Sequence, residues 1–279
     1  MIDTGDTAWM LAATGLVLMM TPALGLFYAG LVRSKNTLNT FMMCIAALAI
    51  ATITWAVVGY SIAFDGTGAF TGGLDHAFLQ DVAFAPREGS SIPHLVFFAF
   101  QATFCIITTA LVSGAVVERM HFGAFLLFAA IWSIAVYAVL AHWAFGGGWL
   151  MERGTLDFAG GVPVEMGSGF SALAAALVVG ARRDYGRQAL LPHNAVYVLL
   201  GAGLLWFGWF GFNGGSGFGT GDAGAPAFAH TPLPPARLRR VEARAAPPLA
   251  GVEVRVAVDV RNSLTGPSGA VAVYGRQKG

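Results

Sequence analysis

The chain has 279 residues, of which 56% are hydrophobic and 11% are charged, with 37 glycines and a formal net charge of +1. These values lie far from those of a soluble globular domain and indicate an all-α polytopic membrane protein. Because the few charges are scattered between apolar runs, the composition favours the lipid bilayer as a partner and argues against nucleic acid. Both cysteines, Cys44 and Cys105, lie in apolar runs, so neither a disulfide framework nor a metal site is predicted.

Six apolar segments are long enough to cross roughly 30 Å of hydrocarbon. We predict transmembrane helices over residues 9–32, 38–64, 94–117, 122–143, 161–179 and 194–212. Acidic residues precede the first segment, where a signal peptide has basic ones, and the segment is too long for a signal-peptide hydrophobic region. We therefore expect the first segment to be retained as a helix.

The connections between these segments alternate in charge. Arginine and lysine lie in the connections at 33–36, 118–121 and 182–188, whereas the loops at 65–93 and 144–160 are glycine-rich and lean acidic. By the positive-inside rule, the basic connections lie in the cytoplasm and the N-terminus lies outside. The sequence therefore predicts a multi-pass protein of the plasma (inner) membrane.

The composition changes at Gly217. Residues 217–279 are rich in proline, alanine and arginine and contain no further spanning segment. The run at 252–260 alternates apolar and polar residues as a half-buried strand does, but it has no evident partner strand. We predict an incomplete transmembrane domain over 1–216 and a tail over 217–279 that is either disordered or the product of a shifted reading frame.

The segment DFAGGVPVEMGSGF, residues 157–170, places two carboxylates near the start of the fifth predicted helix. Asp157 precedes this helix and can cap its free N–H groups. Glu165 lies two turns further in and shares a helical face with small residues, namely Gly161, Ser168, Gly169, Ala172 and Ala176. A carboxylate at membrane depth costs about 2.5–3.5 kcal/mol, so it marks an ion or proton path or is a protonated acid bonded to a neighbouring helix.

Aromatic and hydroxyl residues gather in two other helices. Phe100 and Phe104 are four residues apart, so their rings lie on one face of the third predicted helix. Trp209, Phe212 and Ser216 lie at the end of the sixth, near the external surface in the predicted topology. Alone, these residues are equally compatible with core packing or with an aromatic belt at the membrane interface.

Five segments together resemble the ammonium transporter family (Amt/Mep/Rh). They are GLFYAGLVRSKN at 25–36, FQATFCIITTALVSGAVVER at 100–119, AHWAFGGGWL at 141–150, DFAGGVPVEMGSGFSALAAALVVGAR at 157–182 and WFGWFGFNGGS at 206–216. The resemblance covers residues 6–216 and implies the first half of an eleven-helix protomer. It also implies a homotrimer with one narrow pore in each protomer, transport of ammonium or ammonia, no cofactor and no enzymatic activity.

The resemblance assigns roles to residues by position. It implies an external recruitment site of aromatic and hydroxyl residues at Phe104, Phe145, Trp209, Phe212 and Ser216. It places a phenylalanine gate at Phe100 and Phe104, with Asp157 supporting the recruitment site from below. Phe145 stands where the family commonly has tryptophan, and phenylalanine is the weaker cation–π partner.

Glu165 stands where the family commonly has its first pore histidine. Some family members, notably fungal ones, resemble this chain in having glutamate there. Both side chains titrate and both can hydrogen-bond ammonium or ammonia. The resemblance stops after the sixth helix, so no histidine of this chain lies at the second pore position. We therefore expect that this chain alone does not close a pore. The alternative function is an ammonium-sensing or regulatory membrane fragment. An intramembrane hydrolase is disfavoured, because no histidine shares the helix of Ser168 and Glu165.

Overall fold

The computed structural model describes residues 1–66, 68–87, 89–221 and 223–231. Its elements are α1 (Thr4–Leu31), η1 (Ser34–Asn36), α2 (Thr37–Thr54), η2 (Trp55–Gly59), α3 (Tyr60–Phe64), η3 (Ala77–Leu79), α4 (His94–Val116), α5 (Phe122–Trp132), η4 (Ser133–Ala138), α6 (Val139–Phe145), α7 (Trp149–Glu152), η5 (Gly161–Met166), α8 (Gly167–Val179), α9 (Ala195–Gly215) and α10 (Gly224–His230). Across these residues the chain forms helices and no strand. The all-α fold predicted from the sequence is confirmed.

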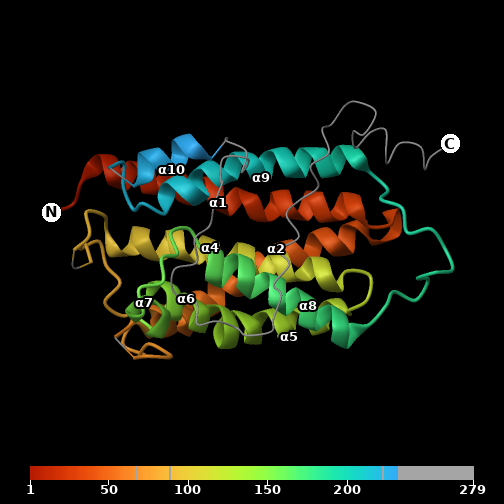
Figure 1. Cartoon of the computed structure of the whole chain (residues 1–279), viewed down its shortest axis with the longest axis horizontal. Helices are drawn as coiled ribbons and strands as arrows, with labels where there is room; N and C mark the ends of the chain where they lie inside the picture. The colour runs from red at the N-terminus through yellow and green to blue at the C-terminus, as the bar shows by residue number, and fades with distance from the viewer. Residues whose placement is uncertain (67, 88, 222, 232–279) are drawn as a thin grey trace, which may run out of the picture. The chain divides into compact units, whose positions relative to one another are not determined.

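Among the described residues, six helical runs are long and apolar enough to cross a membrane, and they lie along one common direction (Figure 1). They span Thr4–Leu31, Ser34–Phe64, His94–Val116, Phe122–Glu152, Gly161–Val179 and Ala195–Gly215. The first begins earlier than predicted because Asp3 caps it, accepting a hydrogen bond of 2.8 Å from the backbone N–H of Asp6. The last ends three residues later than predicted, at Gly215.

Three of the spans contain a π-helical turn, which the hydrophobic pattern did not indicate. These turns are η2, η4 and η5. A π-turn widens the helix locally and occurs often at functional sites. In η5 the turn contains Pro163, whose ring nitrogen carries no N–H to donate. The fifth span therefore begins with an irregular segment that carries Glu165.

The first and last spans pack together through glycine. A Cβ atom on Gly201, Gly208 or Gly211 of α9 would lie 2.5–2.8 Å from backbone atoms of α1. Small residues at such positions let two helix backbones approach closely, which is the main source of helix association in lipid. Figure 1 shows α1 and α9 side by side, although they are the first and last spans in the sequence.

A buried carboxylate fastens the connections at the end of the molecule away from the N-terminus. The side chain of Glu118 is fully buried and accepts hydrogen bonds from Arg33 Nε at 3.0 Å and Asn36 Nδ2 at 2.6 Å. Arg182 Nη1 lies 3.2 Å from its second oxygen, and Arg33 also pairs with Asp184 at 2.6 Å. Burial opposes ionisation of Glu118, but these hydrogen bonds and the Arg182 charge hold its pKa below the usual value.

The helical chain continues beyond the boundary predicted at residue 216. The short helix α10 packs on α1 and α9, with the Phe228 ring 5.5 Å from Trp9 and 4.9 Å from Phe210 between centroids. Residues 217–231, apart from 222, therefore belong with the helical unit as far as the structure describes them. The rest of the predicted tail, including the alternating run at 252–260, lies outside the described residues.

Candidate functional site

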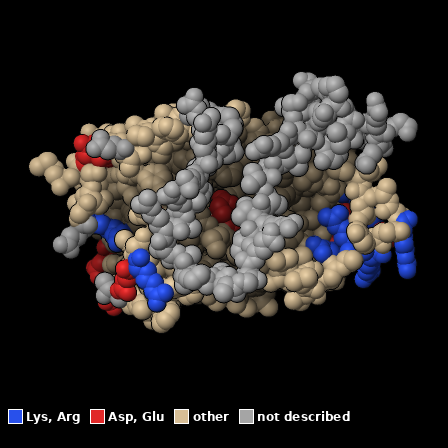
Figure 2. Space-filling model, viewed as in Figure 1, with Lys and Arg blue, Asp and Glu red and all other residues tan. Residues whose placement is uncertain are grey.

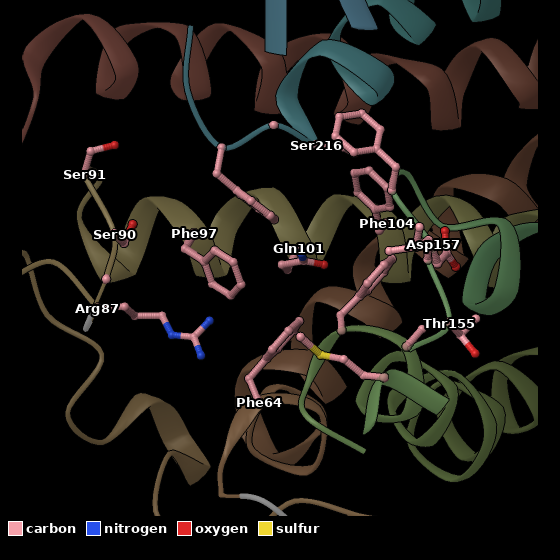
Figure 3. A pocket seen from close by; sticks show the side chains of 18 of the residues that line it. Phe64, Arg87, Ser90, Ser91, Phe97, Gln101, Phe104, Thr155, Asp157 and Ser216 are labelled. Carbon is pink, nitrogen blue, oxygen red and sulfur yellow. The ribbon is translucent and has the colours of Figure 1, made fainter. Parts of the chain in front are cut away.

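A cavity of about 750 Å³ lies where the 65–93 and 144–160 loops meet α4 and the segment after α9. Four of the predicted site residues line it: Phe104, Phe145, Asp157 and Ser216. Figure 3 shows Ser216, Phe104 and Asp157 toward one side of the view, Arg87 toward the other, and Gln101 between them. Three stretches that are far apart in the sequence therefore share one cavity.

The aromatic side chains around Phe104 form a continuous row. The Phe104 ring stacks on Phe212 with 4.2 Å between centroids and 23° between planes. Phe100 follows one helical turn earlier at 5.0 Å, and Trp209 contacts Phe212 at 5.7 Å. Phe100, Trp209 and Phe212 are not among the residues that line the cavity. Phe100 and Phe212 pack directly on Phe104, whose residue is only 2% exposed, and Trp209 packs on Phe212.

Ser216 follows the last residue of α9 and lies at the wall of the cavity. Its Oγ donates a hydrogen bond of 2.8 Å to the carbonyl oxygen of Phe212, one turn earlier. A hydroxyl that donates in this way keeps its lone pairs as acceptors. Since a cation that carries N–H groups donates hydrogen bonds and accepts none, the orientation of Ser216 leaves the required acceptor free.

Asp157 caps the start of η5 with both carboxylate oxygens. Oδ1 accepts from the N–H groups of Gly160 and Gly161, both at 2.8 Å, and Oδ2 accepts from Val162 at 2.7 Å. Gly160 has φ of 100°, a left-handed conformation that favours glycine, and a Cβ there would lie 2.8 Å from Val164 Cγ2. The cap predicted from the sequence is present, and it places a carboxylate in the cavity wall.

Glu165 lies apart from this cavity. Its residue is exposed, as are Gly161 and Gly169, and the described residues give its carboxylate no hydrogen-bond or ion-pair partner. Figure 2 shows charged atoms gathered toward the two ends of the molecule, with one isolated acidic patch between them. The structure therefore does not bring Glu165 together with Phe104 and Ser216 on one wall.

Sequence reasoning missed several residues of the cavity. Gln101 is buried on α4, lines the cavity, and its Oε1 has no hydrogen-bond partner within the described structure. The sequence did contain a signal for Gln101, because a polar amide side chain inside an otherwise apolar span is unusual. Arg87 carried no comparable signal, since it lies in a loop whose path hydropathy does not reveal.

The lining suits a small monovalent cation. Aromatic ring faces carry negative quadrupole charge that attracts a cation. The Ser216 hydroxyl and the Gln101 carbonyl oxygen are acceptors, and Asp157 adds a negative charge. Groups of these kinds can replace part of a cation's hydration shell.

Comparisons with known proteins give two family matches. A model of the Ammonium Transporter Family matches residues 8–234, and a model of the Glycerate kinase family matches residues 218–279. An ammonium transporter of Bacillus subtilis (strain 168) is 47% identical over 231 residues, covering 82% of this chain and 57% of that protein. Ammonium transporter 2 of Schizosaccharomyces pombe is 43% identical, covering 83% and 46%.

Solved structures give the same result. The crystal structure of Candida albicans Mep2 matches with a TM-score of 0.73 and 38% identity, covering 78% of this chain and 49% of that one. A protein described as Sensor Amt Protein matches with a TM-score of 0.72 and 30% identity, covering 78% and 56%. The chain thus spans about half the length of the relatives that it matches.

Proposed function

This chain belongs to the ammonium transporter family, and on that premise we propose that it takes part in moving ammonium or ammonia across the plasma (inner) membrane. The observation that carries the proposal is the cavity in which Phe104, Ser216 and Asp157 meet. It combines an aromatic face, a free acceptor and a carboxylate, which is the chemistry that recruits a small cation.

The proposed path begins at this cavity. Ammonium donates a hydrogen bond to Ser216 Oγ and lies against Phe104 and Phe145, while Asp157 lowers the energy of the positive charge. Passage then requires the stacked ring of Phe104 to move away from Phe212, because the row of rings blocks the way inward. Beyond this gate, Glu165 accepts a proton or a hydrogen bond from the substrate.

A closed pore needs more than this chain provides in the described residues. Glu165 is exposed on a span of which only 22% of the most apolar stretch is buried. We propose that further protein covers this face in the complete transporter, and that the complete transporter is a homotrimer. Transport by the chain alone is then expected to be weak or absent.

Uptake of methylammonium into proteoliposomes tests the proposal. The purified chain is compared with the Bacillus subtilis ammonium transporter, reconstituted at the same protein density, and with empty vesicles. Ammonium-dependent stabilisation of the chain, with uptake at the level of empty vesicles, is expected of an incomplete path that keeps its recruitment site. Absence of both binding and uptake would contradict the proposal.

A sensing role is the second candidate, favoured by the likeness to Sensor Amt Protein and by the absence of a covering partner for Glu165 among the described residues. A sensor binds ammonium without passing it. The two candidates separate when a complete relative is reconstituted with the recruitment residues of this chain, because a transporting site restores uptake and a sensing site does not.

The proposed topology places the cavity outside and the Glu118 junction in the cytoplasm. Cysteine introduced at Ser34, which is exposed beside the junction, is expected to resist an impermeant thiol reagent applied to intact cells. Cysteine at Ser90, in the cavity wall, is expected to react. The native cysteines, Cys44 and Cys105, are buried and serve as the unlabelled background. Labelling at Ser34 from outside would contradict the proposed topology and indicate the opposite orientation.

The origin of the tail predicted at 217–279 is also a proposal, and the Ammonium Transporter Family match reaches residue 234 within it. A shifted reading frame accounts for the sudden change in composition, whereas the Glycerate kinase family match over 218–279 favours a segment with a different history. Translation of the DNA downstream of the Ser216 codon in the other two frames decides between them. Further apolar spans in another frame would support the shift, and the absence of such spans would refute it.

A further inference from the structure

Arg87 occupies an aromatic corner at the mouth of the cavity. Its guanidinium carbon lies 4.5 Å from the centroid of the Phe97 ring and 5.6 Å from that of Phe64. The two rings meet edge to face, with 5.1 Å between centroids and 81° between planes. All three residues line the same cavity as Phe104 and Ser216 (Figure 3).

The backbone around Arg87 fixes its position relative to α4. His94 N donates to Ala85 O at 2.9 Å, Leu95 N donates to Ala83 O at 3.1 Å, and Pro86 and Pro93 form an isolated antiparallel bridge across the turn. Within the turn, Ser90 N donates to Arg87 O at 3.0 Å. Arg87 is therefore tethered to the first turn of the helix that carries Phe97.

The contact between Arg87 and the rings is a cation–π interaction. Among the described residues, no carboxylate lies within ion-pair distance of the Arg87 guanidinium. Phe64 and Phe97 are both buried, and cation–π contacts strengthen where the cation loses water. The corner thus has the chemistry of a cation site, and a side chain of the protein fills it.

We propose that the corner formed by Phe64 and Phe97 is a second site for small monovalent cations, and that Arg87 competes for it as a tethered cation. A cation entering the cavity reaches these rings only by displacing the guanidinium. A group tethered next to its site is present at a high effective concentration, so it lowers the apparent affinity of a free competitor. This inference rests on the proposed function and adds a residue that limits cation entry.

The test measures cation binding to the purified full chain in detergent micelles, by calorimetry at constant ionic strength with the bulky cation N-methylglucamine, rather than a small cation, as the balancing ion. The probes are methylguanidinium, which copies the Arg87 head group, and ammonium. We expect Arg87→Ala to raise the affinity for methylguanidinium about fivefold or more. Replacing Phe97 as well, in Arg87→Ala/Phe97→Ala, is expected to abolish the gain.

Arg153 provides the matched control. Its guanidinium lies 5.2 Å from the Trp149 ring, so Arg153→Ala also removes one positive charge and one cation–π contact, but Arg153 does not line the cavity. We expect Arg153→Ala to leave both affinities unchanged. An equal gain in this variant would show a general charge effect and overturn the inference, as would an unchanged affinity in Arg87→Ala.

Two further outcomes separate this inference from the proposed function. If Arg87→Ala gains methylguanidinium binding while no variant binds ammonium, the corner is a cation site and the ammonium function fails. If the unaltered chain binds ammonium and Arg87→Ala changes neither affinity, the function stands and the inference fails. Arg87→Gln, an uncharged side chain of similar length, replaces Arg87→Ala in each comparison if thermal unfolding shows that the alanine variant is misfolded.

Discussion

The helices α4 and α8 both belong to spans that carry predicted site residues, yet they differ in how much of each the rest of the chain buries. In α4, 78% of the most apolar stretch is buried, whereas in the span containing α8 the value is 22%. Phe104 on α4 is enclosed by other rings, while Phe170 on α8 is 65% exposed. The chain therefore encloses the rings on α4 by itself and leaves α8 largely uncovered among the described residues.

The largest expected effect on stability comes from removing the enclosed Phe104 ring of α4. Phe104→Ala removes the stacking on Phe212 and leaves a cavity beside Phe100, so we expect it to lower the free energy of unfolding by about 3–5 kcal/mol. Phe170→Ala on α8 is the matched control and is expected to cost less than about 0.5 kcal/mol. Thermal unfolding in detergent, followed by circular dichroism, measures both. Equal losses would mean that burial in the described chain does not distinguish the two helices.

The junction that ties the end of α4 to the end of α8 is expected to rank second. Glu118→Gln removes the charge that Arg33 and Arg182 contact, and we expect it to cost about 1.5–3 kcal/mol at pH 7. Because the folded pKa of Glu118 is lowered, its contribution is fully present above the usual carboxyl pKa and is lost as pH falls through the folded pKa.

The unfolding temperature measured from pH 7 down to pH 3 checks this sign. The native chain is expected to lose stability over the acidic part of the range, and the difference between it and Glu118→Gln is expected to shrink there. A difference that stays constant with pH would mean that the charge of Glu118 contributes nothing to the junction.

The cap at the start of the fifth span is expected to matter less. Asp157→Ala leaves the N–H groups of Gly160, Gly161 and Val162 without their acceptor, which typically costs about 1 kcal/mol. Asp157→Asn keeps one acceptor oxygen and is expected to fall between the alanine variant and the native chain. The same unfolding measurement separates the three, and an asparagine variant no better than alanine would assign the effect to charge alone.

The smallest effect on stability is expected at Glu165. Its carboxylate is exposed and has no partner among the described residues, so Glu165→Gln is expected to change the free energy of unfolding by less than about 0.5 kcal/mol. In a complete relative that carries the same glutamate, we expect the substitution to impair methylammonium uptake strongly. Unchanged uptake across the pH range, in a well-folded variant, would leave Glu165 without a role in passage.

Length and hydropathy were sufficient to predict the six spans, because any segment that crosses lipid must be long, apolar and helical. The helix ends were less predictable, since Asp3 moves the first start by a capping hydrogen bond rather than by hydrophobicity. The π-turns left no trace in the apolar pattern. Pro163 accounts for the irregular turn η5, but nothing in the sequence around Trp55 or Ser133 indicates the π-turns η2 or η4.

The candidate site was predictable where it lay on helices and unpredictable where it lay on loops. Phe100 and Phe104 share a face because of helical periodicity, and the structure places their rings together. Arg87 reaches the cavity through a turn whose path depends on backbone hydrogen bonds to α4, and no periodic signal encodes that path. Of the small residues predicted to share a face with Glu165, Gly161 and Gly169 are exposed as it is, whereas Ser168 is buried, and what covers Glu165 was not readable from this sequence.

The pairing of α1 with α9 has a consequence for biosynthesis. The face of α1 that receives Gly201, Gly208 and Gly211 meets its partner only after all the intervening spans have been made. At 5–20 residues per second, that interval is on the order of ten seconds or more. During this interval the face of α1 that will pack against the glycines of α9 is unoccupied in the membrane. The insertion machinery or a neighbouring chain therefore has time to contact it first.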